Sequence, residues 1–142
     1  MKTLRERLRQ FEADAGHPIR VGLVGAGQMG TGLVGQMELM DGMRAMAVAD
    51  VVPGRAYEAL MEADVPEDKA AATASAEEAD AAIESGRAAA LESMDTLLAV
   101  ENIDIVVEST GIPEVGAQVC MKSIEAGKNV INMNVEADAT IG

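Results

Sequence analysis

The chain has 142 residues, 49% of them hydrophobic, and its formal net charge is −13 at pH 7. This length is that of one globular domain, while the negative charge and an aromatic content of 1% argue against a nucleic-acid partner. The single cysteine excludes an internal disulfide, and no apolar run approaches the roughly 20 residues of a membrane span, so we expect a cytoplasmic protein without a membrane partner.

The first 17 residues are expected to form a helix ahead of the sheet. Thr3 and Glu6 have the spacing of a capping box, and leucine or phenylalanine at positions 4, 8 and 11 forms an apolar stripe. Gly16 and Pro18 then end the helix. The stripe would pack on the sheet or on a partner, so a homo-oligomer is among the expected assemblies. We assign residues 1–17 to this helix and residues 18–142 to one α/β domain.

Short apolar runs alternate with helical patterns along the rest of the chain. We expect strands at residues 19–24, 44–49, 87–91, 103–107 and 128–133. The helices between them are expected to end near residues 41, 63, 83, 99 and 126. The alanine-rich stretch 70–90 has the weakest pattern. Apart from the short strand near its end, we assign it to helix, because alanine and glutamate are strong helix formers.

This order of elements predicts an open, doubly wound parallel sheet of the Rossmann type, with about five strands and helices on both faces. Six strands are common in such domains, and this chain ends just as a further helix begins. We therefore expect a chain that is truncated before its catalytic domain.

A glycine-rich turn follows the first strand and is the most specific motif of the chain. Gly25 allows a tight bend, Gly27 allows the backbone to approach a diphosphate, and Gly30 allows the helix to pack closely. The first helical N–H groups, around Gln28 and Met29, would point at the anion. This G-x-G-x-x-G pattern between a strand and a helix predicts a dinucleotide-binding domain over residues 18–142.

An acidic residue at the end of the second strand supports the same prediction. Asp50 follows Gly30 by 20 residues, and its carboxylate would accept hydrogen bonds from the ribose hydroxyls of the cofactor. Asp50 favours NAD, because a carboxylate repels the 2′-phosphate of NADP. Arg55 could accommodate that phosphate if Asp50 turned away, so the expected cofactor is NAD or NADP.

Two further segments are expected at the same edge of the sheet, where the carboxyl ends of the strands meet. Ser109, Thr110 and Gly111 follow the fourth expected strand and would lie beside the pyrophosphate and the nicotinamide ribose. Asn134 follows the fifth and would lie near the nicotinamide. No metal site is predicted, and no acid–base set accompanies these residues, because the single histidine, His17, lies at the opposite end of the sheet.

Two segments resemble the nucleotide-binding half of the homoserine dehydrogenase-like oxidoreductases. They are Val106-Val107-Glu108-Ser109-Thr110-Gly111 and Gly127-Lys128-Asn129-Val130-Ile131-Asn132-Met133-Asn134. The tail from Asn134 to Gly142, with the N-terminal helix and the entry Pro18-Ile19-Arg20-Val21-Gly22, is similar to the branch that contains the deoxyxylulose-phosphate reductoisomerase-like enzymes.

The resemblance implies an NAD(P)-dependent oxidoreductase whose catalytic domain, often followed by a SAF-type domain, lies after the nucleotide-binding domain. A small-molecule substrate would bind mostly through that downstream domain, so this chain alone is expected to be inactive. Homoserine dehydrogenases usually have Asn-Lys at the last strand end, whereas here Asn134 is followed by Val135. This difference favours the reductoisomerase-like branch, which implies NADPH.

Two other functions are open from the sequence. A methyltransferase that uses S-adenosylmethionine also has a glycine loop after its first strand, but Gly30 argues for close helix packing under a pyrophosphate. A non-catalytic, nucleotide-sensing regulatory module fits the acidic surface and the N-terminal helix equally well.

Overall fold

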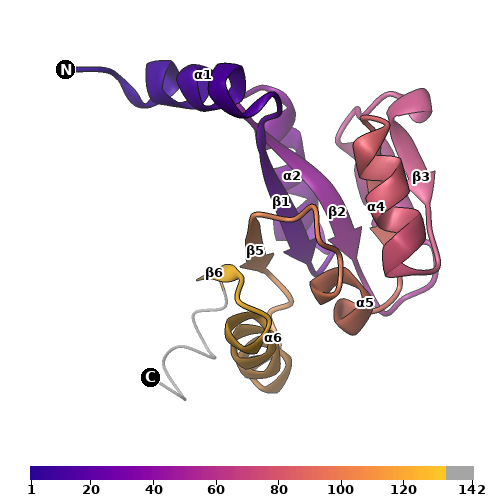
Figure 1. Ribbon diagram of the computed structural model, residues 1–142. Helices are drawn as coiled ribbons and strands as arrows, with labels where there is room; N and C mark the ends of the chain where they lie inside the picture. Colours follow the sequence, from indigo (N-terminus) through magenta and orange to yellow (C-terminus); the bar gives the residue numbers. More distant parts are fainter. Residues whose placement is uncertain (134–142) are drawn as a thin grey trace.

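A computed structural model describes residues 1–133 of the chain (Figure 1). The strands are β1 (Ile19–Val24), β2 (Met43–Ala49), β3 (Ala70–Ala72), β4 (Ala88–Leu91), β5 (Ile105–Glu108) and β6 (Asn129–Asn132). The helices are α1 (Leu4–Ala15), α2 (Gln28–Glu38), α3 (Arg55–Glu62), α4 (Ala76–Glu84), α5 (Met94–Leu98) and α6 (Pro113–Glu125), with a 3₁₀ helix, η1 (Glu67–Lys69).

The strands form one parallel sheet in the order β3-β4-β2-β1-β5-β6. The predicted open, doubly wound α/β fold is therefore confirmed. The chain first winds outward from β1 through β2 to the edge strand β3 and then returns, through β4, to β5 on the other side of β1. The strand order thus reverses between β1 and β5, which is where open α/β sheets bind their ligands.

The sheet has six strands in the described residues, whereas about five were predicted. The missed strand is β3, which lies in the alanine-rich stretch that we assigned to helix. Alanine has a high helix propensity, but Ala70–Ala72 pairs in register with Ala88–Ala90 of β4. The hydrogen bonds of this pairing outweigh the local preference, which is a weak guide in three-residue edge strands.

Two apolar layers cover the two faces of the sheet. Helices α2 and α3 pack on the first face through residues such as Val34 and Leu60. Helices α4, α5 and α6 pack on the second face through residues such as Ile83, Leu97 and Val119. Figure 1 shows α2 and α4 on opposite faces of the sheet, and right-handed crossovers impose this division on the observed strand order.

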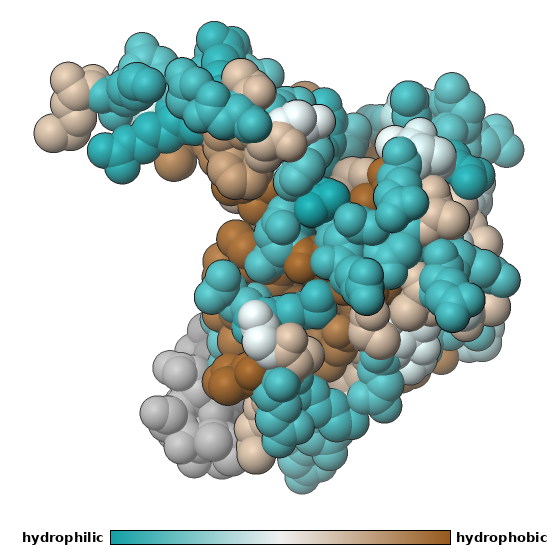
Figure 2. All heavy atoms as spheres, in the orientation of Figure 1, coloured by the Kyte–Doolittle hydropathy of each residue, from teal (hydrophilic) through white to brown (hydrophobic). Residues whose placement is uncertain are grey.

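Helix α1 extends beyond the sheet as an arm (Figure 1). It has the predicted capping box, in which Thr3 and Glu6 bond to each other's backbone N–H, and it ends at Gly16 with a positive φ. Of its side chains only Leu8 is buried, and Figure 2 shows a mainly hydrophilic outer surface. In the described part of the chain no helix has the length and apolar composition needed to cross a membrane.

The arm is fastened to the turn between α2 and β2. Arg5 and Arg9 both contact the Asp41 carboxylate, at 3.0 Å and 2.8 Å. Gly42 follows with φ of 78°, and a Cβ there would lie 2.3 Å from the carbonyl oxygen of Leu8. The hydrogen bonds and charges of the two guanidinium groups hold the pKa of Asp41 below its ordinary value.

We predict that the docking of α1 depends on pH through Asp41. Because its pKa is lowered in the folded chain, the carboxylate stabilises docking fully above its ordinary pKa of 3.8, and the contribution is lost as the pH falls through the lowered value. Asp41→Asn should therefore lower the hydrogen-exchange protection of the α1 amides at neutral pH. Asp95→Asn, which removes the partner of Lys122 on α6, is the control. Equal protection of α1 in all three proteins would contradict the prediction.

Candidate functional site

A cavity of about 310 Å³ lies at the carboxyl ends of the strands, at the position where the strand order reverses. Three loops form it: the β1–α2 turn, the β2–α3 loop and the β5–α6 loop. Its lining residues are Val24, Gly25, Gly27, Ala49, Asp50, Val51, Val52, Arg55, Met94, Ser109, Thr110, Ile112 and Val115. Six of the residues named from the sequence are in this set: Gly25, Gly27, Asp50, Arg55, Ser109 and Thr110.

The floor of the cavity is a close contact between Gly25, Gly30 and Ser109. Gly25 has φ of 102°, and a Cβ on it would lie 2.8 Å from the carbonyl carbon of Ser109. A Cβ on Gly30 would lie only 2.1 Å from the carbonyl oxygen of Gly25. The hydroxyl of Ser109 donates to the carbonyl oxygens of Val24 and Gly25, at 3.1 Å and 3.0 Å. Both glycines are therefore required by the backbone packing itself.

Gly27 differs from the other two glycines of the motif. A Cβ on Gly27 would meet no atom within 4 Å, and its backbone has φ of −76°, which any residue can adopt. Gly27 is the N-cap of α2 and supplies no side-chain hydrogen bond to the helix start. The first N–H groups of α2, from Gln28 and Met29, lack carbonyl partners within the helix. The empty space at the Cβ position of Gly27 thus lies next to the backbone N–H donors at the start of α2.

Asp50 is anchored at the cavity wall by two backbone groups. Its Oδ2 accepts the N–H of Ala26 at 2.9 Å, and its Oδ1 accepts the N–H of Val52 at 2.9 Å. Each carboxylate oxygen has capacity for a second hydrogen bond. The carboxylate therefore fixes the glycine turn to the end of β2 and can still accept hydroxyl groups from the cavity.

The β5–α6 loop carries the remaining predicted residues. Thr110 lines the cavity, and both its N–H and its hydroxyl donate to Oε1 of Glu108. The hydroxyl of Ser109 points at the backbone of the glycine turn, so Ser109 joins the two loops. Gly111 is exposed, has φ of 74° and does not line the cavity. Asn134 lies outside the described residues.

Sequence reasoning missed several apolar residues of the wall. Met94 and Val115 come from the first turns of α5 and α6, and Ile112 is the N-cap of α6. Each follows a strand end or helix cap that the sequence does indicate, so their proximity to the edge could have been inferred. Which side chains face the cavity depends on how α5 and α6 pack, and the sequence pattern does not define that.

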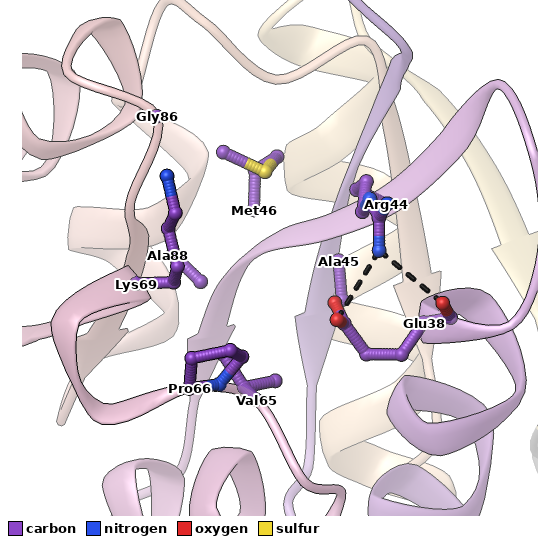
Figure 3. Close-up of a pocket in the computed structure, with 9 residues that line it drawn as sticks. All are labelled: Glu38, Arg44, Ala45, Met46, Val65, Pro66, Lys69, Gly86 and Ala88. Atoms are coloured by element: carbon purple, nitrogen blue, oxygen red, sulfur yellow. Dashed lines mark hydrogen bonds and ion pairs between the residues drawn. The ribbon is translucent and has the colours of Figure 1, made fainter.

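A second cavity of about 320 Å³ lies near the opposite edge, beside the amino ends of β2 and β4 (Figure 3). Its charged residues are Glu38, Arg44 and Lys69. Arg44 contacts the Glu38 carboxylate at 3.1 Å and also donates to the Glu38 carbonyl, so this pair is satisfied within the wall. No predicted residue lies here, and ligands of open α/β sheets bind at the other edge.

The family model described as "Homoserine dehydrogenase, NAD binding domain" matches residues 25–140. The chain belongs to this family. The predicted resemblance to homoserine dehydrogenase-like proteins is thereby confirmed at the level of the domain. No curated protein matches the chain in sequence at a significant level.

Solved structures of dehydrogenases share the fold of this homoserine dehydrogenase-type NAD-binding domain. A myo-inositol dehydrogenase from Lactobacillus casei in complex with NAD(H) and myo-inositol has a TM-score of 0.60 at 16% identity, over 81% of this chain and 28% of that one. A probable dehydrogenase from Thermotoga maritima has a TM-score of 0.59 at 18% identity, over 80% and 27%. The WlbA dehydrogenase from Bordetella pertussis in complex with NADH and UDP-GlcNAcA has 0.57 at 18%, over 82% and 28%. The chain thus spans less than a third of their lengths.

Two glycines of the same helix should respond in opposite ways to alanine. Gly32→Ala places its Cβ where no atom lies within 4 Å, so the higher helix propensity of alanine should stabilise the domain by roughly 0.5–1 kcal/mol. Gly30→Ala forces a Cβ against the Gly25 carbonyl and should destabilise it by roughly 1–3 kcal/mol. Urea unfolding followed by circular dichroism measures both changes. A stabilising Gly30→Ala would contradict the close packing described here.

Proposed function

We propose that this chain is the cofactor-binding part of an NAD(P)-dependent oxidoreductase and that it holds the dinucleotide along the carboxyl edge of the sheet. The observation that carries the proposal is the open space at Gly27, next to the first N–H groups of α2, in a turn whose other two glycines are fixed by packing. A diphosphate fits such a site, because backbone donors and the helix dipole favour an anion.

The order of the strands supports the direction in which the cofactor would lie. Asp50 is at the end of β2, the glycine turn follows β1, and Thr110 follows β5, and these three strands are consecutive in the sheet. An extended dinucleotide has its adenosine ribose, pyrophosphate and nicotinamide ribose in the same sequence. We therefore assign the adenosine ribose to Asp50, the pyrophosphate to Gly25, Gly27 and the start of α2, and the nicotinamide half to the β5–α6 loop.

The net charge of the chain does not oppose this assignment. The charged residues that line the cavity are Asp50 and Arg55, so the wall is locally balanced although the chain carries −13 overall. The donors for the pyrophosphate are backbone groups, whose partial charges act over a short range. The bound cofactor would supply hydride transfer chemistry, while the chain supplies binding and orientation.

We further propose that NAD is preferred over NADP. From sequence, Arg55 could accept the 2′-phosphate only if Asp50 turned away. In the structure both oxygens of Asp50 hold backbone N–H groups, so turning away would break two hydrogen bonds. These two bonds support a carboxylate that stays at the proposed ribose position, where it would repel a 2′-phosphate.

The activity of a longer protein would require residues outside this domain. In the described residues, no candidate acid–base pair lines the cavity, where the titratable groups are Asp50 and Arg55. We propose that a downstream domain binds a small-molecule substrate and supplies the catalytic groups. The step from Asn134 to Val135, where homoserine dehydrogenases usually have Asn-Lys, supports an enzyme of the reductoisomerase-like branch.

The placement of the pyrophosphate predicts the effect of Gly27→Val. The branched side chain should fill the space of the diphosphate and weaken NADH binding by roughly tenfold or more, while the fold should survive because a Cβ at Gly27 meets no atom within 4 Å. Isothermal titration calorimetry measures the affinity, and circular dichroism checks the fold. Gly32→Val, in the same helix, is the matched control and should bind as the wild type does.

Unchanged NADH affinity in folded Gly27→Val would contradict this placement. Titration of the wild-type chain with S-adenosylmethionine tests the rival function. Heat from S-adenosylmethionine, with none from NADH or NADPH, would overturn the proposal in favour of a methyltransferase.

Asp50 should determine the choice between the two dinucleotides. Asp50→Asn removes the charge that would repel a 2′-phosphate, so the ratio of the NADPH to the NADH dissociation constant should fall by roughly tenfold. The ratio is informative because any loosening of the glycine turn weakens both cofactors alike. Glu92→Gln, at an exposed residue directly after β4, controls for the loss of one negative charge. An unchanged ratio in Asp50→Asn would contradict the proposal that Asp50 selects between the two dinucleotides.

A further inference from the structure

Glu108 is a completely buried acidic residue at the carboxyl end of β5. Its exposed fraction is 0%, and within residues 1–133 it is the one charged residue in the core. Side chains alternate along a strand, so Glu108 lies on the same face of the sheet as Val106, which is the face that α6 covers. Glu108 does not itself line the cavity, but the next two residues in the sequence, Ser109 and Thr110, do.

The two oxygens of the Glu108 carboxylate have different surroundings. Oε1 accepts the N–H of Thr110 at 2.7 Å and also the hydroxyl of Thr110. That hydroxyl oxygen in turn accepts the N–H of Ile112 at 3.3 Å, so the carboxylate closes the turn that leads into α6. Oε2 is buried and has no hydrogen-bond partner in the described part of the chain.

The turn alone does not explain a charged residue at this place. A buried carboxylate oxygen without a partner is costly, and no arginine or lysine in residues 1–133 forms an ion pair with Glu108. Glutamine has the same shape and could accept the same hydrogen bonds from Thr110 without the charge. The hydrogen bonds of the turn therefore do not explain why this residue is glutamate rather than glutamine.

We propose that Glu108 is a positioning residue whose buried negative charge favours the oxidised form of the cofactor. The inference rests on the proposed function, which assigns the nicotinamide half to the β5–α6 loop. The nicotinamide ring of NAD⁺ carries a positive charge and that of NADH does not, so a nearby carboxylate attracts only the oxidised ring. In the interior this attraction is screened much less than at the surface.

The test is the ratio of the dissociation constants of NAD⁺ and NADH, measured by calorimetry on the full chain. Glu108→Gln should weaken NAD⁺ binding more than NADH binding, by a factor of about three to ten. Thr110→Val keeps the carboxylate and removes both hydrogen bonds of the Thr110 hydroxyl, so it should change the two affinities by the same factor. Glu114→Gln removes an exposed carboxylate from α6 and should leave the ratio unchanged.

The outcomes separate the two proposals. Equal weakening of NAD⁺ and NADH in Glu108→Gln, or no weakening of either, would show that the charge has no such effect and would overturn the inference alone. If that variant does not fold, Glu108→Met, which removes the carboxylate without leaving a buried amide group unpaired, replaces it under the same criteria. A wild-type chain that binds neither form contradicts the proposed function itself.

Discussion

The structure depends on a contact, made mostly by backbone atoms, between the glycine turn after β1 and the end of β5. Gly30 lies so close to the carbonyl of Gly25 that a single methyl group would separate them, and the Ser109 hydroxyl bonds to that same carbonyl. This contact fixes the start of α2 relative to two neighbouring strands. The donors at the helix start are thereby held in place before any ligand arrives, so the free energy of binding is not spent on ordering the loop.

Acidic side chains stabilise the loops around the cavity and also have roles in the proposed binding of the cofactor. Asp50 fastens the turn to the end of β2, and Glu108 fastens Thr110 of the next loop to the end of β5. Both are single carboxylates that accept backbone N–H groups, which are the donors that loops leave without partners. Asp50 lines the cavity, and Glu108 bonds to Thr110, which also lines it, so residues of the proposed binding site also stabilise its walls.

The sequence predicts the parts of the fold whose pattern is local. The bounds of β1 agree with the expected 19–24, and α1 has the expected capping box, because an apolar run, a turn and a cap are each encoded within a few residues. Strand β3 was missed because three alanines become a strand only through their pairing with β4. For the site, the three glycines and Asp50 could be predicted from their spacing. The second role of Asp50, the inward hydroxyl of Ser109 and the burial of Glu108 could not, since each depends on contacts across the sheet.

The sheet is built unevenly along its width. Its β3–β4 side consists largely of alanine, with Ala79 and Ala89 completely buried, whereas larger side chains such as Leu23, Leu97 and Val106 fill the β1–β5 side. On the alanine side, truncating a side chain removes only one methyl group, but a larger side chain would push α3 or α4 away from the strands. On the other side, truncation opens voids. The two halves of one sheet therefore tolerate different substitutions. The β1–β5 half requires large apolar side chains, whereas the β3–β4 half accepts only small ones.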